Sequence, residues 1–294
     1  MADQSPPKWT VLALLNWTRG HLQRAGAQSP RLAAEVLLAA VLGCKRIELY
    51  TRYDYLPTED QLTRFRELIR RAALHEPVAY LIGVKEFYSL PFQVTSDVLV
   101  PRPETEILVE QAVGLLRAQG RPGTMWDACT GSGCVAVATA KQVSDLRVLA
   151  TDLSPAAVEV ARRNVALHHL EGRVAVHVAD LLTLPAEWSG TDTFDVITAN
   201  PPYIPDAAEV APEVMHEPAI ALRGGADGLQ LVRRVIADAP QFLRPGGALM
   251  MEFGIDQSEA VRDLLRSAGA FGEPRVFTDH QGIDRAVVAI KRAS

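Results

Sequence analysis

The chain has 294 residues, of which 48% are hydrophobic, and its formal net charge is −5. This length and composition indicate a globular protein with a sizeable core and more than one domain. Residues 1–10 lack the charged and apolar regions of a signal peptide. The longest apolar run near the N-terminus, Val36 to Gly43, is far shorter than the about 20 residues that span a bilayer. We therefore expect no membrane segment and, by default, a cytoplasmic location.

The residue pattern gives little support to metal or nucleic-acid chemistry. The three cysteines lack CxxC spacing and the seven histidines lack a motif such as HExxH, so we expect no metal site. Proteins that grip a nucleic-acid backbone usually carry a basic stripe, and this chain is acidic. Arg64, Arg66, Arg70 and Arg71 cluster in the N-terminal part, where we interpret them as a solvated helix face.

The N-terminal part, residues 1–76, is predicted to be a helical domain. Its leucines recur at helical spacing, and Thr58 with Gln61 fits a capping box at the start of a helix. The following segment, 77–103, is predicted to be a linker. Within it, residues 87–94 are aromatic and punctuated by proline, which suits a β-hairpin.

The third part, residues 104–294, is predicted to open with a helix near Glu104 and then to alternate between strands and helices. Such alternation predicts βαβ units, with a parallel sheet covered by helices on both faces. Two late strands, near 274–279 and 285–291, are close enough in sequence to pair antiparallel. The other expected elements are strands at Thr124–Ala128, Arg147–Thr151, Val174–Val178, Phe194–Ala199 and Ala248–Phe253 and helices at 133–142, 155–168 and 228–243.

The first of these strands runs into a glycine loop that ends at Gly133, ahead of a predicted helix. Glycines let the backbone turn tightly against a ligand, and the helix N-terminus offers unpaired N–H groups. Two cofactors fit, because Gly131-x-Gly133-x-x-Ala136 also satisfies the dinucleotide fingerprint. Asp152, after the second strand, suits the ribose hydroxyls of either cofactor, and a favourable charge at the next helix N-terminus is the alternative.

Asp127, at the start of this loop, favours S-adenosylmethionine over a dinucleotide. A carboxylate at the strand end repels an anionic pyrophosphate and attracts the sulfonium and ammonium groups of S-adenosylmethionine. The alternative is that Asp127 only caps local backbone N–H groups. After the third strand, Asp180 suits a hydrogen bond to the adenine amino group, and Leu181 suits packing on the ring.

The fourth strand ends in Asn200-Pro201-Pro202-Tyr203, which suits an NH2 group on a planar system. The prolines fix two φ angles, so the Asn200 side-chain oxygen and the Pro201 carbonyl can accept both N–H bonds while Tyr203 stacks on the plane. We call these four residues the clamp. It favours the build-up of positive charge on the nitrogen as that nitrogen attacks the methyl group, so catalysis rests on positioning and fixed dipoles. The alternative is an ordinary turn, because Asn-Pro pairs are common in turns. The position of the tetrapeptide, after the fourth strand of a domain with a glycine loop, favours the clamp.

Over roughly residues 75–290 the chain resembles the peptide-chain release factor N5-glutamine methyltransferases, the HemK-type family of class I methyltransferases. The resemblance implies a Rossmann-like domain with a mostly parallel seven-stranded sheet, a small N-terminal helical domain and a β-hairpin linker. It also implies S-adenosyl-L-methionine as cofactor and, as substrate, the glutamine of the Gly-Gly-Gln loop of class 1 release factors. Besides the tetrapeptide, the resemblance is carried by Glu76–Gly83, Glu86–Tyr88, Val100–Glu106, Gly224–Leu229 and Pro245–Gly247.

The family pattern also implies the site residues. Asn200, Pro201, Pro202 and Tyr203 would hold the glutamine amide, with the first, second and fourth as catalytic residues, and the N-terminal helices would help to dock the release factor. Cys129 stands where many members have glycine, and we expect a negative φ there. The implied cofactor-binding residues are Arg102, Glu104, Thr105, Asp127, Cys129, Thr130, Gly131, Ser132, Gly133, Asp152, Leu153, Asp180, Leu181 and Asn200.

Other functions remain open at this point. A sister family that methylates a glutamine of a ribosomal protein shares the tetrapeptide, although the segment Pro101–Glu106 favours the release-factor branch. An adenine-N6 methyltransferase would have to flip its base into the site, and the acidic balance counts against a nucleic-acid substrate. A dinucleotide-dependent oxidoreductase fits the glycine loop alone, and a non-catalytic binding module would leave the clamp without a use.

Overall fold

The computed structural model describes residues 8–188, 190 and 193–293. The chain forms two compact units, Met1–Gly83 with Ala211–His216 and Val84–Val210 with Glu217–Ser294. The division at Gly83 falls inside the segment 77–103 that we predict as a linker. The division into three parts, 1–76, 77–103 and 104–294, stays a prediction.

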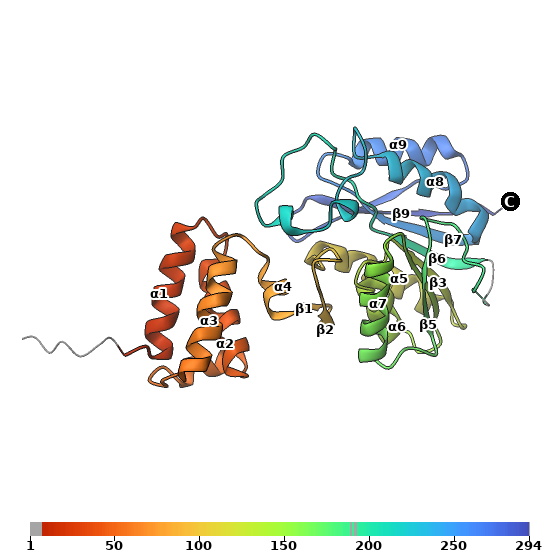
Figure 1. Cartoon of the computed structure of the whole chain (residues 1–294). Helices are drawn as coiled ribbons and strands as arrows, with labels where there is room; N and C mark the ends of the chain where they lie inside the picture. Colours follow the sequence, from red (N-terminus) through yellow and green to blue (C-terminus); the bar gives the residue numbers. More distant parts are fainter. Residues whose placement is uncertain (1–7, 189, 191–192, 294) are drawn as a thin grey trace, which may run out of the picture. The chain divides into compact units, whose positions relative to one another are not determined.

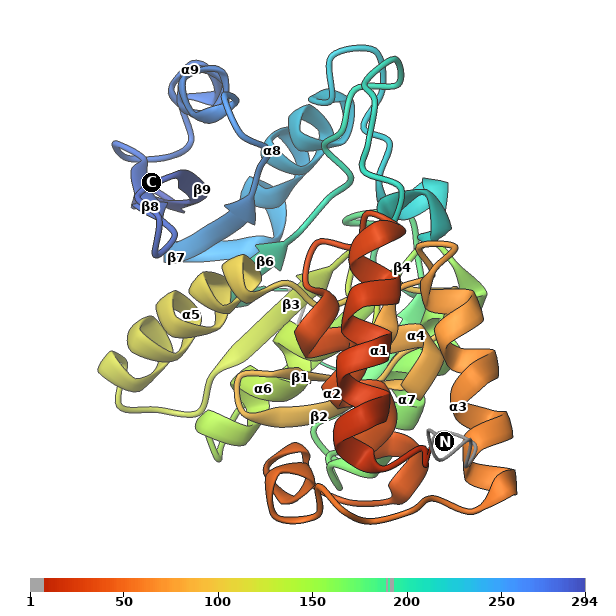
Figure 2. The ribbon, with the colours of Figure 1, turned by 90° about the vertical axis from the view of Figure 1, so that its left-hand side faces the viewer.

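The first unit is helical. Its third helix begins with the predicted capping box: the Gln61 N–H donates to Thr58 Oγ1 at 3.3 Å, and the Thr58 N–H donates to Gln61 Oε1 at 2.9 Å. Figure 2 shows α1 and α3 side by side. The helices are α1 (Val11–Arg24), α2 (Pro30–Leu42), a 3-10 helix (Arg46–Thr51), α3 (Glu59–Ala72) and α4 (Val78–Ile82).

The four clustered arginines lie on or at the end of α3, where Arg64, Arg66 and Arg70 are exposed, as a solvated face requires. Arg70 and Arg71 form ion pairs with Glu67 and Glu76. The exposed Arg70–Glu67 pair contributes little to stability, and the Arg71–Glu76 pair is partly buried.

The second unit contains a seven-stranded sheet in the order β5-β4-β3-β6-β7-β9-β8, which confirms the predicted mostly parallel sheet. Strand β9 pairs antiparallel with β8, as predicted for the two late segments, and it also pairs antiparallel with β7. The strands are β3 (Thr124–Ala128), β4 (Arg147–Asp152), β5 (Val174–Val178), β6 (Phe194–Ala199), β7 (Leu243–Glu252), β8 (Arg275–Thr278) and β9 (Asp284–Ile290).

Helices cover both faces of this sheet (Figure 1). One hydrophobic cluster joins one face to α5, α6 and α7, and a second joins the other face to α8 and α9. All six residues of β6 are buried, as expected for a central strand covered on both sides. The helices are α5 (Glu106–Ala118), α6 (Cys134–Gln142), α7 (Pro155–Leu167), α8 (Gln230–Phe242) and α9 (Ser258–Ala268).

Most element limits lie within two residues of the sequence prediction, and two differences have a structural cause. The helix expected near Glu104 starts with a 3-10 turn, Pro103–Thr105, and becomes α-helical at Glu106. Strand β7 starts at Leu243, five residues before the predicted Ala248, because Leu243 pairs with Phe194 across a register shift. Gly246 takes a φ of +77° there, which glycine tolerates and which lets the strand continue through the irregularity.

The segment before β3 contains the predicted hairpin, β1 (Val84–Phe87) paired antiparallel with β2 (Leu90–Gln93). It is anchored to the sheet domain by Asn164 on α7, whose side chain accepts from the Gln93 N–H at 2.7 Å and donates to the Gln93 carbonyl at 2.9 Å. The same amide donates to the Ser132 carbonyl at 2.8 Å. The hairpin is thereby connected through one buried side chain to the glycine loop.

Asp195 forms a buried ionic cluster at the start of β6. Its side chain is 2% exposed and pairs with Arg121 and Arg244. It also accepts from the Thr124 N–H at 2.8 Å, which connects β6 to the start of β3. Burial alone would raise the pKa of Asp195, but the Arg121 guanidinium, the Thr124 N–H and Arg244 together hold it below its usual value.

Candidate active site

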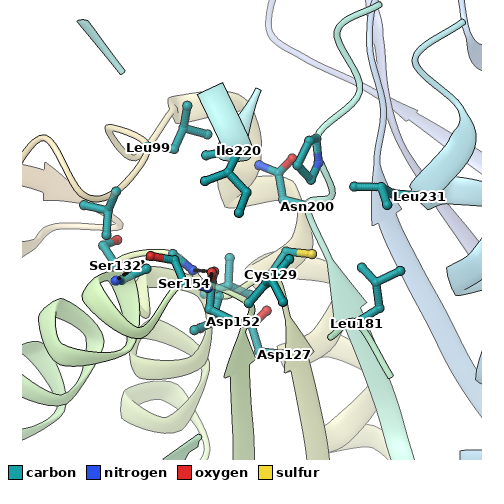
Figure 3. Close-up of a pocket in the computed structure, with 18 of the residues that line it drawn as sticks. Leu99, Asp127, Cys129, Ser132, Asp152, Ser154, Leu181, Asn200, Ile220 and Leu231 are labelled. Carbon is teal, nitrogen blue, oxygen red and sulfur yellow. Dashed lines mark hydrogen bonds between the residues drawn. The ribbon is translucent and has the colours of Figure 1, made fainter. Parts of the chain in front are cut away.

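A cavity of about 510 Å³ lies at the carboxyl ends of β3, β4 and β6 (Figure 3). This is the edge where ligands bind in open α/β sheets, near the point where the strand order reverses between β3 and β6. Its volume lies in the range of small-molecule sites, about 300–1,000 Å³. Thirteen predicted residues line it: Arg102, Thr105, Asp127, Cys129, Thr130, Gly131, Ser132, Asp152, Leu153, Asp180, Leu181, Asn200 and Pro202.

The other four predicted residues, Glu104, Gly133, Pro201 and Tyr203, are described by the structure but are not among those that line the cavity. Gly133 contributes to the packing of the helices next to the cavity. A Cβ on Gly133 would lie 3.2 Å from Cβ of Ala161, so glycine allows the start of α6 to pack closely against α7.

The glycine loop turns through three left-handed residues, with φ of +56° at Cys129, +55° at Gly131 and +80° at Gly133. The expectation of a negative φ at Cys129 was therefore wrong. The chain leaves β3 by crossing toward β4, where the Thr130 N–H donates to the Thr151 carbonyl at 2.9 Å. A left-handed residue is needed for this crossing, and glycine adopts it without the steric cost that cysteine bears.

Asp152 at the end of β4 holds both flanking loops. Its carboxylate accepts the Gly131 N–H at 2.9 Å and the Ser154 N–H at 3.0 Å, next to the start of α7. Burial raises the pKa of Asp152, and these backbone donors oppose the rise. Each carboxylate oxygen has two lone pairs, so the predicted ribose contact and the contact with the helix N-terminus are compatible.

Asp127 is 2% exposed and accepts hydrogen bonds from the hydroxyls of Thr130 and Thr198, both at 2.6 Å. Burial raises its pKa to about 6, against these hydroxyls and the Ala136 N–H, which favour the charged form. Local capping, the alternative to cofactor binding, is thus part of its role. The carboxylate is also part of the cavity wall, where a cation would favour its ionised form.

The arginines that line the cavity, Arg102, Arg223 and Arg234, are each engaged by the protein. Arg102 pairs with Glu217, and Arg234 donates to Asp180 at 2.7 Å. Arg223 donates to the carbonyls of Pro205 and Ala208, both at 2.8 Å. A dinucleotide pyrophosphate would therefore meet compensated guanidinium groups beside carboxylates, and the electrostatics disfavour it.

Asn200 follows β6 and is tied to two residues on other elements. Its Nδ2 donates to Thr105 Oγ1 at 3.3 Å, and Thr105 Oγ1 donates to Glu252 Oε2 at 2.6 Å. The Tyr203 hydroxyl donates to the other oxygen, Glu252 Oε1, at 3.1 Å, while its carbonyl accepts from Gln257 at 3.0 Å. The clamp residues are thus held from behind by the carboxyl end of β7.

Sequence reasoning did not identify Glu217 or Glu252. Glu252 is 2% exposed and ends an apolar strand at the carboxyl edge of the sheet, a signal that would have found it. Glu217 accepts the Val100 N–H at 3.2 Å and pairs with Arg102. No local sequence pattern indicates that Glu217 binds these groups, because the contacts join residues more than a hundred positions apart.

Across residues 8–188, 190 and 193–293, the structure contains no cluster of three or more His, Cys, Asp or Glu side chains suited to a metal ion. No helix in these ranges has the length and apolar character to cross a membrane.

Comparisons with known proteins cover both units. The family model of the PrmC N-terminal domain matches residues 13–83, and that of the methyltransferase small domain matches residues 104–282. The release factor glutamine methyltransferase of Geobacter sulfurreducens is 41% identical over 287 residues, 97% of this chain and 98% of the relative. The protein of the same name from Rhodopirellula baltica is 40% identical over 291 residues, 97% of each chain.

Solved structures share the architecture at lower identity. The hMettl16 catalytic domain in complex with a 3′UTR hairpin aligns with a TM-score of 0.56 at 14% identity, over 99% of this chain and 95% of that chain. At this identity the likeness shows the fold alone.

Proposed function

Because the chain belongs to the release factor glutamine methyltransferase family, we propose that it methylates the side-chain amide nitrogen of the glutamine in the Gly-Gly-Gln loop of class 1 release factors. The methyl donor is S-adenosyl-L-methionine, and the reaction takes place in the cytoplasm. The observation that carries the proposal is the Asn200 clamp, which follows β6 beside a carboxylate-lined cavity.

The residues of the cavity fit this donor. Its wall combines carboxylates for cationic and hydroxyl groups with the apolar side chains of Leu99, Leu181, Ile220 and Leu231 for a flat base (Figure 3). Bound there, S-adenosyl-L-methionine supplies an electrophilic methyl group on a positively charged sulfur. Asp152 would accept the ribose hydroxyls, and Asp180, steadied by Arg234, would accept the adenine amino group.

The clamp residues account for the activation of a poor nucleophile. Asn200 Oδ1 and the Pro201 carbonyl accept the two N–H bonds of the glutamine amide, and the Tyr203 ring lies against its plane. The amide lone pair is delocalised in the ground state, so acceptors on both hydrogens would stabilise the positive charge that develops on nitrogen as it takes up the methyl group. The sulfur–methyl bond would break at the same time, and its electron pair would stay on the sulfur of the departing S-adenosylhomocysteine. A proton then leaves the nitrogen to water.

A methylation assay with labelled donor tests the proposal. The protein is incubated with a class 1 release factor, the same factor with its loop glutamine changed to alanine, ribosomal proteins, and DNA or RNA. Label is expected in the intact release factor and in none of the others. Label only in a ribosomal protein, or in nucleic acid, would assign the chain to one of the alternative substrates.

A further inference from the structure

Two buried polar side chains, Thr105 and Glu252, form a hydrogen-bonded relay with the half-buried Asn200 of the clamp. Thr105, at the end of a 3-10 turn, is 3% exposed, and Glu252, at the end of β7, is 2% exposed. The relay runs from Asn200 Nδ2 through Thr105 Oγ1 to Glu252 Oε2, with distances of 3.3 and 2.6 Å. It therefore connects the carboxyl ends of β6 and β7 through a residue that precedes α5.

The direction of each hydrogen bond follows from the number of protons available. A carboxylate only accepts, so the single Thr105 hydroxyl proton is committed to Glu252. The Thr105 oxygen then has only lone pairs to offer Asn200, and only the NH2 end of the Asn200 amide can meet them. The second oxygen of Glu252 is likewise engaged by the Tyr203 hydroxyl at 3.1 Å.

The charges around Glu252 decide whether it acts as an acceptor. Burial raises the pKa of Glu252, and Glu104 adds to that rise. The hydroxyls of Thr105 and Tyr203 and the guanidinium of Arg285 favour the ionised form. Each oxygen faces one hydroxyl group, and both hydroxyls can donate at the same time when Glu252 is a carboxylate.

We propose that Thr105 and Glu252 are positioning residues that set the rotamer of the Asn200 amide, with Nδ2 toward Thr105 and Oδ1 left to accept from the substrate nitrogen. This inference rests on the proposed function and names what makes the clamp work. An Asn amide flipped by 180° would place NH2 against the NH2 of the glutamine, donor against donor. Without the relay both rotamers are accessible, and only one is productive.

The kinetic test uses variants that change one hydroxyl. Thr105→Val keeps the shape of the side chain and removes the acceptor, whereas Thr105→Ser restores the hydroxyl and is the matched control. Thr105→Val is expected to lower kcat by about 10²-fold, the loss typical of a misplaced transition-state hydrogen bond. The KM for release factor should change by less than about threefold, and Thr105→Ser should recover most of the kcat that Thr105→Val loses.

Glu252 is tested in a double-mutant cycle. Glu252→Met replaces a buried carboxylate by an apolar side chain of similar length and removes the acceptor of both hydroxyls, and circular dichroism checks that the variant folds. If the two residues act through one relay, Thr105→Val added to Glu252→Met lowers kcat no further than Glu252→Met alone. Independent, additive losses would overturn the relay.

Nuclear magnetic resonance reads the rotamer directly, because the sequence contains only three asparagines, Asn16, Asn164 and Asn200. Selective 15N-asparagine labelling gives three side-chain NH2 signals, and Asn200→Ala identifies the one of interest. The Asn200 signal should exchange with solvent faster in Thr105→Val and as in wild type in Thr105→Ser. An unchanged Asn200 signal in Thr105→Val overturns the inference. A wild-type protein that methylates no release factor overturns the proposed function instead, and the Asn200 signal still tests the rotamer on its own.

Discussion

The N–H of Gly131 donates to the carboxylate of Asp152 at 2.9 Å, and this contact connects the glycine loop after β3 to the end of β4. The same carboxylate accepts the Ser154 N–H at 3.0 Å. One side chain therefore ties together the loops that follow two parallel strands and that form part of the cavity wall. A residue placed in this way affects the shape of the ligand site as well as its charge.

Asp152→Asn is expected to weaken S-adenosylhomocysteine binding by at least about tenfold, the equivalent of one lost polar contact. The substituted amide has one acceptor oxygen, so its NH2 group must face one of the two backbone N–H donors. Calorimetry measures the loss. Asp145→Asn, the same change at an exposed position before β4, is the control and should bind as wild type does.

Asn200→Ala is expected to lower kcat by about 10²–10³-fold, because it removes one of two acceptors for the charge on nitrogen. Circular dichroism should remain close to wild type, since the backbone of the clamp is held by its prolines. Activity within tenfold of wild type would contradict the role proposed for Asn200.

The affinity for S-adenosylhomocysteine is expected to rise as the pH increases through about 6, where Asp127 ionises. Above this pH the carboxylate is charged and attracts the ammonium group of the ligand; below it, the neutral form does not. Asp127→Asn should flatten the pH dependence. An unaltered pH profile in this variant would assign the effect to another group.

The same shift affects folding stability with the opposite sign. The pKa of Asp127 in the folded protein lies above its ordinary value of 3.8. Its contribution to stability is therefore complete below pH 3.8 and is lost as the pH rises through about 6. Relative to wild type, Asp127→Asn should be more stable at pH 7 than at pH 4 in urea denaturation.

Cys129→Gly is expected to raise the free energy of unfolding by up to about 1 kcal/mol, because the left-handed backbone at this position strains any residue with a Cβ. Cys129→Val should lower it, since a β-branched side chain tolerates a positive φ least. Urea denaturation of the two variants gives the comparison. Equal stabilities would show that the loop relieves the strain in some other way.

Asp195→Ala is expected to destabilise the protein by about 3 kcal/mol, the lower end of the range for breaking a buried ion pair, because its arginine partners are partly exposed. Arg121→Ala should cost less, since Arg244 still faces the carboxylate. The pKa of Asp195 is lowered, so its stabilising contribution is present above the ordinary value and is lost as the pH falls.

The alternation of elements, the parallel sheet and most strand limits followed from the sequence, because buried strands such as β6 are short apolar runs of distinctive composition. Two features that differed from the prediction depend on neighbouring segments. Strand β7 is extended to Leu243 by pairing with Phe194, and the left-handed φ of Cys129 comes from the crossing toward Thr151. Neither cause lies within the local segment.

The sequence by itself determined the chemical types at the site: a carboxylate after each of three strands, a glycine loop, and an amide held by two prolines. Only the tertiary structure decided how these groups are engaged. It buried Asp127 under two threonine hydroxyls, paired Asp180 with Arg234, and placed Thr105 and Glu252 behind Asn200. The physical reason is that local sequence determines only which donors and acceptors each strand end presents. Their hydrogen-bond partners depend on proximity in the folded chain, which joins residues as far apart in sequence as Thr105 and Glu252.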